Sequence, residues 1–577
     1  VLARTIRDAV VENVKINVKS GESDSYLTEG GIITALMSHS TIYRNVEINS
    51  DGKTDTLFGC SYWNYDARKA NAFENVKVTV KSIGGLLCLR ANIAESLYTI
   101  DGVEGITVAY VRSYSDANNT AIVGSAAELA IGAENADVTE IASVSLDGRE
   151  IADFSFENGV LTITDGFTAS DMGAKTLVLK GKAGIKAVTV YLGVTVEVPA
   201  EEVALGGERE IVLSNGTEFA LDLGDYTSAT VLSVTLGGEN ATYSNGKLTV
   251  TDEFKADVKK HGMQTLKVTV QKDGKYYNVI ANVLVVTQEI SDIDSLTAAL
   301  TPTEGSSVVY GYYRLSKDLS SNGWYSVGYA EKWSAVQRSN ADLGFRGTFD
   351  GNGKTISSWF YGDGLFGVVG NGAVIKNLTV SGSITTNMQF VGGVLGWSNG
   401  ADVINCVSMA DIDCMGYSGG VVGTVRAGSS VISGCAFIGS LNSVYGTALG
   451  GILGHGAAGI ELTIENCYTN VSGLRDGART GITGQSSVGG IAGRIQDGSR
   501  VVSCYAAGSF TASSDAAPII GMITSGSSAK NCYYCSDGYK YGIASGSGET
   551  VGMTAAEMKS VLAAKLGDAF KEDEYGL

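Results

Sequence analysis

Short segments in which apolar and polar residues alternate, separated by glycines, fill most of the chain. Val76-Lys77-Val78-Thr79-Val80 alternates with a period of two, and segments such as Leu378-Thr379-Val380 and Val501-Val502 are short, β-branched and bounded by turn residues. Helices need longer runs with apolar residues every three or four positions, so these segments are predicted to be strands. The pattern predicts an all-β chain.

A double-glycine signal recurs between residues 364 and 532. It opens with Gly364-Leu365-Phe366-Gly367 and returns as Gly392-Gly393-Val394-Leu395-Gly396, Gly419-Gly420-Val421-Val422-Gly423, Gly450-Gly451-Ile452-Leu453-Gly454 and Gly489-Gly490-Ile491-Ala492-Gly493, with a weaker copy ending at Gly521. The last glycines, at 367, 396, 423, 454, 493 and 521, are 29, 27, 31, 39 and 28 residues apart. A second mark follows each of them: Asn377-Leu378, Asn405-Cys406, Gly434-Cys435, Asn466-Cys467, Ser503-Cys504 and Asn531-Cys532.

A period near 30 is typical of a solenoid. In a coil of parallel strands stacked about 4.8 Å apart, equivalent residues lie above one another. We therefore expect an inward ladder of cysteines: Cys406, Cys435, Cys467, Cys504 and Cys532. Beside it we expect a turn at which asparagine amides bond from rung to rung: Asn377, Asn405, Asn466 and Asn531. The paired glycines fit bends where φ is positive or where two backbones approach closely.

These repeats resemble the GLUG-motif family of bacterial surface proteins. Phe349–Ile356 is similar to the turn before the family's first repeat, Tyr312–Leu315 with Trp324 to its lead-in strands, and Met553–Phe570 to its closing helix. In the family a Gly-Tyr-Pro segment and a tryptophan usually follow, which this sequence lacks. The resemblance covers roughly residues 290 to 577. It implies a parallel β-helix on a secreted, often very large bacterial protein, and no defined enzymatic activity.

The first 105 residues carry a similar pattern. Glu12-Asn13-Val14, Arg44-Asn45-Val46 and Glu74-Asn75-Val76 recur at spacings of 32 and 30 residues. We interpret residues 1–105 as the C-terminal part of a second GLUG-like β-helix. The sequence opens in the middle of this pattern, so we expect the chain to be a fragment of a longer protein.

Residues 106–289 replace the double glycines by alternating strands with Asn-Gly and Asp-Gly turns. The region repeats internally, since Ser143–Gly148 aligns with Ser233–Gly238, and Asn158–Asp165 aligns with Asn245–Asp252. Two units of about 90 residues with short, regular strands predict tandem immunoglobulin-like sandwiches at 106–199 and 200–289. They resemble the Ig-like spacers of bacterial surface proteins.

Two helices are predicted around the second solenoid. Residues 291–300 place capping residues before an apolar stripe. Ala555–Leu566 follows Thr554, which stands at capping-box spacing from Glu557. We expect this last helix to cover the open end of the solenoid. The predicted organisation is completed by a GLUG-type β-helix at 290–553 and a closing helix and tail at 554–577.

Composition excludes some classes of partner. A net charge of −19 argues against nucleic acid or an anionic membrane, and no stretch of 18 apolar residues predicts a membrane span. The nine cysteines are interpreted as buried thiols, with disulfides as the alternative. Cys532 and Cys535 have Cys-x-x-Cys spacing, but no βαβ context favours redox or metal chemistry there. We expect no cofactor.

Residues with catalytic potential are sparse. None of His39, His261 and His455 lies in a His-Glu-x-x-His motif, and His455 is interpreted as a turn residue. Asp350 is interpreted as a structural turn residue. Asp411 and Asp413 should face one side of a strand, where a solvated face, calcium binding and catalysis all remain possible readings. Asp402 lies close in sequence to Asp411 and Asp413, and Asp363 lies close to Asp350.

Two aromatic clusters are candidates for ligand contact, because exposed rings stack on sugar faces. Packing at the ends of the solenoids is the alternative reading. The residues are Tyr62, Trp63 and Tyr65 in the first cluster, and Trp324, Tyr325, Tyr329 and Trp333 in the second.

These observations favour a non-enzymatic, extracellular bacterial surface protein that acts as an adhesin or a structural spacer. The expected partner is a host or microbial surface glycan or protein, with no nucleic acid and no direct membrane insertion. One alternative is a carbohydrate-binding or carbohydrate-cleaving β-helix. Another is an accessory region of a large secreted protease.

Overall fold

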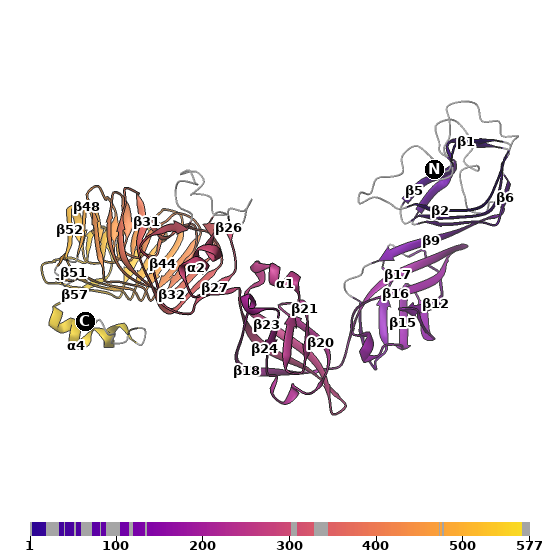
Figure 1. Cartoon of the computed structure of the whole chain (residues 1–577), viewed down its shortest axis with the longest axis horizontal. Helices are drawn as coiled ribbons and strands as arrows, with labels where there is room; N and C mark the ends of the chain where they lie inside the picture. Colours follow the sequence, from indigo (N-terminus) through magenta and orange to yellow (C-terminus); the bar gives the residue numbers. More distant parts are fainter. Residues whose placement is uncertain are drawn as a thin grey trace. The chain divides into compact units, whose positions relative to one another are not determined.

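A computed structural model gives the fold of the chain (Figure 1). It describes residues 3–7, 9–18, 34–39, 41–50, 53–58, 72–80, 82–87, 104–114, 119–132, 136–301, 308–327, 344–471, 474–475, 478–479, 481–567 and 570. Strands dominate and helices are few and short, which confirms the predicted all-β class. Within the described ranges, no helix is long and apolar enough to cross a bilayer.

The described chain divides into two compact units. The first contains Val1–Val203, Ala229–Ser233 and Val268–Asn278, and the second contains Ala204–Ser228, Val234–Lys267 and Val279–Leu577. The division passes through the second predicted sandwich, so each unit is described separately.

The first unit begins with parallel strands. β2 (Val10–Val18), β4 (Ile42–Ser50), β7 (Val76–Val80) and β9 (Ile106–Tyr114) pair in this order, each in parallel with the next. The register stacks one apolar residue from each strand: Ile16, Ile48, Val78 and Val108. A second parallel sheet contains β1 (Ala3–Arg7), β3 (Thr34–His39), β5 (Lys53–Phe58) and β8 (Ser82–Leu87).

The antiparallel part of this unit grows from the same sheet. β9 also pairs in parallel with β17 (Lys186–Glu197), which continues antiparallel through β16 (Gly173–Ala183), β12 (Glu140–Leu146) and β13 (Arg149–Ile151). A facing sheet contains β11 (Ala127–Ala130), β15 (Val160–Asp165) and β14 (Asp153–Glu157), and one apolar core includes residues of both sheets. The boundary expected near residue 105 therefore falls at a strand that belongs to both parts.

The second antiparallel part is a seven-stranded sheet. Its order is β18 (Glu201–Val212), β24 (Lys275–Val286), β23 (Gly262–Lys272), β20 (Thr230–Leu236), β21 (Glu239–Ser244), β22 (Lys247–Val250) and β19 (Glu218–Ala220). A short helix, α1 (Asp252–Ala256), follows β22 and is capped by the Thr251 hydroxyl. The predicted Asn-Gly and Asp-Gly turns place Asp147, Asn158 and Asn245 at φ of 49°, 53° and 52°.

The described part of residues 288–553, in the second unit, contains 31 strands in one continuous ladder, from β25 (Gln288–Ile290) to β57 (Thr550–Met553). One column runs through β27 (Tyr312–Leu315), β31 (Thr348–Val369), β32 (Val374–Thr385), β35 (Asp402–Ile404), β39 (Ser429–Ser433), β44 (Glu461–Glu465), β50 (Arg500–Val502) and β54 (Ser528–Lys530). Each strand pairs in parallel with its counterpart about 30 residues later, which aligns Phe349, Ile375, Val403, Ile432, Ile464, Val501 and Ala529. We call this ladder the stack.

The double glycines lie where neighbouring backbones approach closely. None of Gly392, Gly393, Gly419 and Gly420 has a positive φ. A Cβ on Gly419 would stand 1.9 Å from the carbonyl oxygen of Val422, and one on Gly393 would stand 2.5 Å from that of Gly420. Of the two reasons considered for these pairs, close approach applies and positive φ does not.

Two helices pack onto the stack. α2 (Ile293–Leu300) is capped by the Asp292 carboxylate and buries Leu296 and Leu300 in the stack's core. α4 (Ala555–Leu566) begins after Thr554, whose side chain and backbone nitrogen exchange hydrogen bonds with Glu557. Its Met558, Leu562 and Leu566 pack with Tyr505, Tyr533 and Met553.

These tyrosines lie on successive turns, because Tyr468 pairs with Tyr505 and Tyr505 with Tyr533. α4 therefore packs along a lateral face of the last turns, below β51 and β57 in Figure 1, and not over the open end as expected. The tyrosine side chains face outward from the stack, and packing against α4 removes their rings from water.

Candidate functional site

The five predicted ladder cysteines are all fully buried and free. The Cys467 thiol lies 3.1 Å from the carbonyl oxygen of Glu465, and its sulfur accepts a hydrogen bond from the Cys435 nitrogen over 3.4 Å. Burial, with the neighbouring thiol Cys435 second, raises the pKa of Cys406 well above its usual value. A buried thiol held in its neutral form is a poor nucleophile, so Cys406 acts as a small apolar side chain, and full burial gives the other four ladder cysteines the same packing role.

The asparagine positions form a turn in the left-handed region. Asn377, Asn405, Asn466 and Asn531 have φ between 51° and 54°. Nδ2 of Asn405 donates to Oδ1 of Asn377 over 3.4 Å, and Nδ2 of Asn531 donates to the Ser503 hydroxyl over 2.9 Å. The repeat uses asparagine, glycine or serine here because a larger or branched residue is strained at positive φ.

The first unit carries the same device. Asn13, Asn45 and Asn75 have φ of 59°, 50° and 52°. Nδ2 of Asn45 donates to Asn13 over 3.1 Å, and Nδ2 of Asn75 donates to Asn45 over 2.9 Å.

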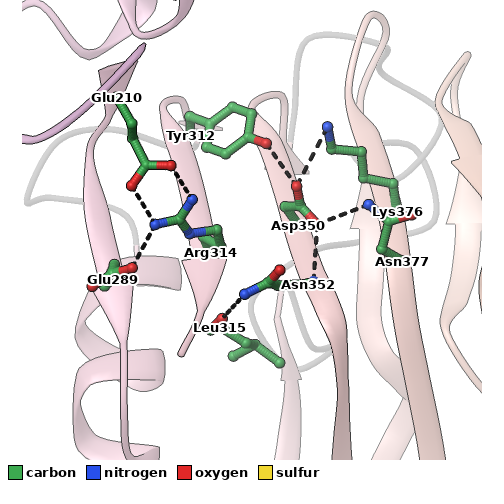
Figure 2. A network of polar contacts seen from close by, with 9 residues as sticks. All are labelled: Glu210, Glu289, Tyr312, Arg314, Leu315, Asp350, Asn352, Lys376 and Asn377. Carbon is green, nitrogen blue, oxygen red and sulfur yellow. Dashed lines mark hydrogen bonds and ion pairs between the residues drawn. The ribbon is translucent and has the colours of Figure 1, made fainter. Parts of the chain in front are cut away.

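Asp350 lies at the centre of a polar network at the start of the stack (Figure 2). Its carboxylate accepts hydrogen bonds from the Tyr312 hydroxyl at 2.7 Å, the Asn377 amide at 3.0 Å and the Asn352 backbone nitrogen at 2.9 Å. Nζ of Lys376 lies 3.4 Å away. Burial alone would raise the pKa of Asp350, but these hydrogen bonds outweigh it and lower the pKa. A carboxylate occupied in this way is a structural group.

Arg314 joins two carboxylates beside this network (Figure 2). It makes a two-pronged contact with Glu210 of β18, and its Nη2 lies 2.5 Å from Glu289 of β25. Hydrogen bonding to Glu210, then to Glu289, raises the pKa of Arg314. The guanidinium therefore stays charged and ties β27 to both strands.

The aspartates of the stack bond from turn to turn. Asp411 and Asp413 are exposed on one side of β36 (Val407–Cys414). Asp411 accepts a hydrogen bond from the Ser440 hydroxyl at 2.7 Å, and Asp413 accepts one from the Asn442 amide at 2.9 Å. Asp402 accepts from the Val431 nitrogen at 2.8 Å. Within the described ranges there is no group of three or more histidine, cysteine or acidic side chains that could hold a metal.

Most of the predicted aromatic clusters lie outside the described residues: Tyr62, Trp63, Tyr65, Tyr329 and Trp333. Trp324 and Tyr325 lie in β29 (Trp324–Val327), whose backbone pairs them with Phe360 and Tyr361 of β31.

Two exposed aromatic residues that the structure does describe lie on the partner strand. Trp359 is 64% exposed and Tyr361 43% exposed, while Phe360 between them is buried. Trp359 lines a shallow hollow of about 250 Å³ with Ser321, Asn322, Ser357, Ser358 and Gly382. The sequence analysis did not identify Trp359 as a candidate, although the alternation of Trp359-Phe360-Tyr361 places the first and third ring on one side of the strand.

His455 is not a turn residue, in contrast to the interpretation from sequence. It lies in β43 (Leu453–Gly456), is nearly fully buried, and packs its ring 5.2 Å from that of Tyr417. Burial, followed by the charges of Arg426 and Arg494, lowers the pKa of His455 to about 4. The imidazole is therefore neutral at physiological pH.

No family model and no curated protein matches the chain. Solved structures with partial similarity include a chimeric titin Z1Z2 tandem carrying a GRGDS peptide (14% identity, 29% of this chain and 93% of that one, TM-score 0.13). They also include the four N-terminal Ig domains of Dscam1 isoform 6.9 (13%, 31% and 48%, 0.13) and the endo-fucoidan hydrolase MfFcnA4 (14%, 30% and 28%, 0.12). The chain thus spans less than half the length of the last two. Similarity at this level carries no argument about fold or function.

Proposed function

We propose that the chain is part of a non-enzymatic, extracellular bacterial surface protein that acts as an adhesin or spacer. In this proposal residues 290–553 are a parallel β-helix of the GLUG type, residues 1–105 are part of another, and 106–199 and 200–289 are Ig-like domains. The parallel register at intervals of about 30 residues supports the assignment of the β-helices. The two antiparallel parts support the assignment of the Ig-like domains.

The observation that carries the proposal is the way the stack uses its side chains. Inward positions repeat one apolar column, as in Val403, Ile432 and Ile464. Outward carboxylates such as Asp411 and Asp413 are held by side chains of the next turn. These interactions stabilise a regular surface, which is what adhesion and spacing require.

Adhesion is tested with beads that carry the full chain. Retention on mucin, on collagen and on epithelial monolayers is compared with that of beads carrying albumin. We expect selective retention on at least one surface. Retention no greater than that of albumin beads on all three would overturn adhesion, and release of reducing sugar from polysaccharide by the chain would overturn the non-enzymatic assignment.

Carbohydrate binding is a second candidate, favoured by the hollow beside Trp359. An exposed indole next to serine and asparagine side chains combines a stacking surface with hydrogen-bonding groups, which suits a neutral sugar. Trp359→Ala should abolish binding to any neutral glycan that the chain retains on an array. Tyr541→Ala, at a ring of similar exposure (63%), is the matched control. Equal losses in the two variants would contradict this site.

A further inference from the structure

Another face of the stack carries an aromatic row on successive turns. Phe390 of β33 (Phe390–Gly392) lies 4.8 Å from the Trp397 ring of β34 (Leu395–Ser398), nearly edge-on at 79°. Phe390 also stacks at 5.7 Å and 5° on Tyr417 of β37 (Tyr417–Gly419). Tyr417 in turn contacts His455. The row is partly covered, because Trp397 and His455 are buried and Phe390 and Tyr417 are half-buried.

Two arginines lie along this row. Arg426, exposed directly after β38 (Val422–Val425), places its guanidinium carbon 5.2 Å from the Trp397 ring centre and 5.7 Å from that of Phe390. Arg494 lies in β49 (Ala492–Ile495) and pairs in register with His455. His455 contacts Tyr417 and is the register partner of Arg494, so the row leads from Arg426 to Arg494 and the two arginines belong to one face.

This face lacks the carboxylate partners that some other cations in the chain have. Arg314 and Arg112 each have carboxylate partners, whereas no ion pair involving Arg426 or Arg494 occurs among the described residues. The Nε of Arg494 is buried, and within the same described residues it has no hydrogen-bond partner. In a chain with a net charge of −19, the two arginines and the aromatic row form a locally cationic surface.

We propose that the face formed by Phe390, Trp397, Tyr417, Arg426, His455 and Arg494 binds an acidic polysaccharide through carboxylate or sulfate groups. Guanidinium groups bind such anions with two parallel hydrogen bonds, and contact with the rings holds Arg426 in place before the ligand arrives. The proposal does not depend on the Trp359 hollow or on the adhesive role of the whole chain.

The spacing along the stack favours a polysaccharide over an acidic peptide. β38 and β49 are two steps apart, with β43 between them, which separates their backbones by about 10 Å at roughly 4.8 Å a step. Arg494 aligns with Thr424, two residues before Arg426, so the two arginines are at least this far apart along the backbone. An extended peptide repeats its same-face side chains every ~6.8 Å. A glycan with an acidic group on every second sugar repeats over two ring lengths, which is closer to the separation of the strands.

The test uses the full chain and calorimetric titration with three probes: unsulfated chondroitin, its carboxyl-reduced neutral form, and a sulfated galactan without carboxylates. We expect binding to at least one of the two acidic glycans and none to the neutral form. Chondroitin binding identifies carboxylate as the recognised group, and sulfated galactan binding identifies sulfate. Failure to bind either acidic glycan, or equal binding of the neutral form, would overturn the proposal.

Variants locate the binding. Arg426→Gln and Arg494→Gln should each weaken it about tenfold, since each removes a charge-assisted hydrogen bond. Arg500→Gln changes the same charge at an exposed position of β50 and should leave affinity unchanged, as should Trp359→Ala. Arg426 is exposed, so its variant keeps the test valid if Arg494→Gln unfolds. An Arg500 variant as weak as the other two would refute the site in favour of general charge attraction.

Discussion

A methyl group at Gly420 tests whether close approach of the turns governs the double-glycine repeat. The added Cβ would stand 2.2 Å from Cδ2 of the Phe437 ring and 2.4 Å from the carbonyl oxygen of Gly451 on the next turn. Ordinary contacts start near 3.4 Å, so both neighbours must move by about 1 Å. The ring is packed in the core and the carbonyl accepts the Val421 amide hydrogen, so neither moves freely.

Overpacking of a core costs about 1–3 kcal/mol, and a clash with backbone belongs at the upper end. Replacing glycine by alanine returns about 0.4–1 kcal/mol through the unfolded chain. We therefore expect Gly420→Ala to destabilise the stack by about 2 kcal/mol or more. Gly481→Ala is the matched control, because its Cβ would be closer than an ordinary contact only to the Ser509 carbonyl oxygen, at 3.2 Å, which a shift of about 0.2 Å relieves, and its φ is not positive. It should change stability by less than about 0.5 kcal/mol.

Hydrogen exchange read by peptide reports the stability of the stack separately from the other parts of the chain. A loss of about 2 kcal/mol corresponds to exchange roughly thirtyfold faster in peptides covering residues 417–437. Exchange in the Gly420 variant within threefold of that in the Gly481 variant would refute the argument from close approach.

Three further predictions concern the stack. The pKa of His455 is about 4 in the fold and about 6.5 in the unfolded chain, so the unfolded chain binds the proton more tightly and the free energy of unfolding should fall by up to about 3 kcal/mol between pH 6.5 and 4. His455→Gln should remove this part of the pH dependence, and urea melts that show the same pH dependence for the variant and the parent chain would contradict it. Cys467→Ser should cost about 1–2 kcal/mol, because oxygen fills the fully buried site less well than sulfur, and unchanged thermal unfolding would count against the ladder. Asn405→Ala should cost about 1–2 kcal/mol at φ 52° while Asn405→Gly costs little, and equal melting temperatures of the two would refute the left-handed turn.

The strands of the stack could be predicted because two independent backbone constraints recur at the same interval of about 30 residues. Gly393 must lack a Cβ where the backbones of two turns approach, and Asn405 must tolerate positive φ. Each constraint acts on every turn, so both appear in the sequence as residues of restricted type at a fixed phase. The turns at Asn158 and Asn245 were predictable on the same ground.

The outward surface was less predictable. Local alternation says on which side of a strand Trp359 lies, but not whether another segment covers it. Tyr468, Tyr505 and Tyr533 also face outward from their strands, but α4 packs on this row and covers it, whereas Trp359 stays exposed. A signal was present there, because tyrosine follows the ladder cysteine only in the last three copies. His455 was misread because its burial depends on Tyr417, a neighbour from another turn.

The repeat itself separates structure from recognition. An inward residue such as Ile432 packs between copies of its own position, so it must stay apolar, and its substitution by a polar residue should affect the whole stack. Outward residues do not have to pack against copies of their own position. Trp359, Arg426 and Arg494 have no counterpart of the same type on the turns that pair with them, where Ser383, Asn399 and His455 stand. Side chains that the repeat does not require are therefore the candidates for ligand contact, and their variants should lose binding while the stack stays folded.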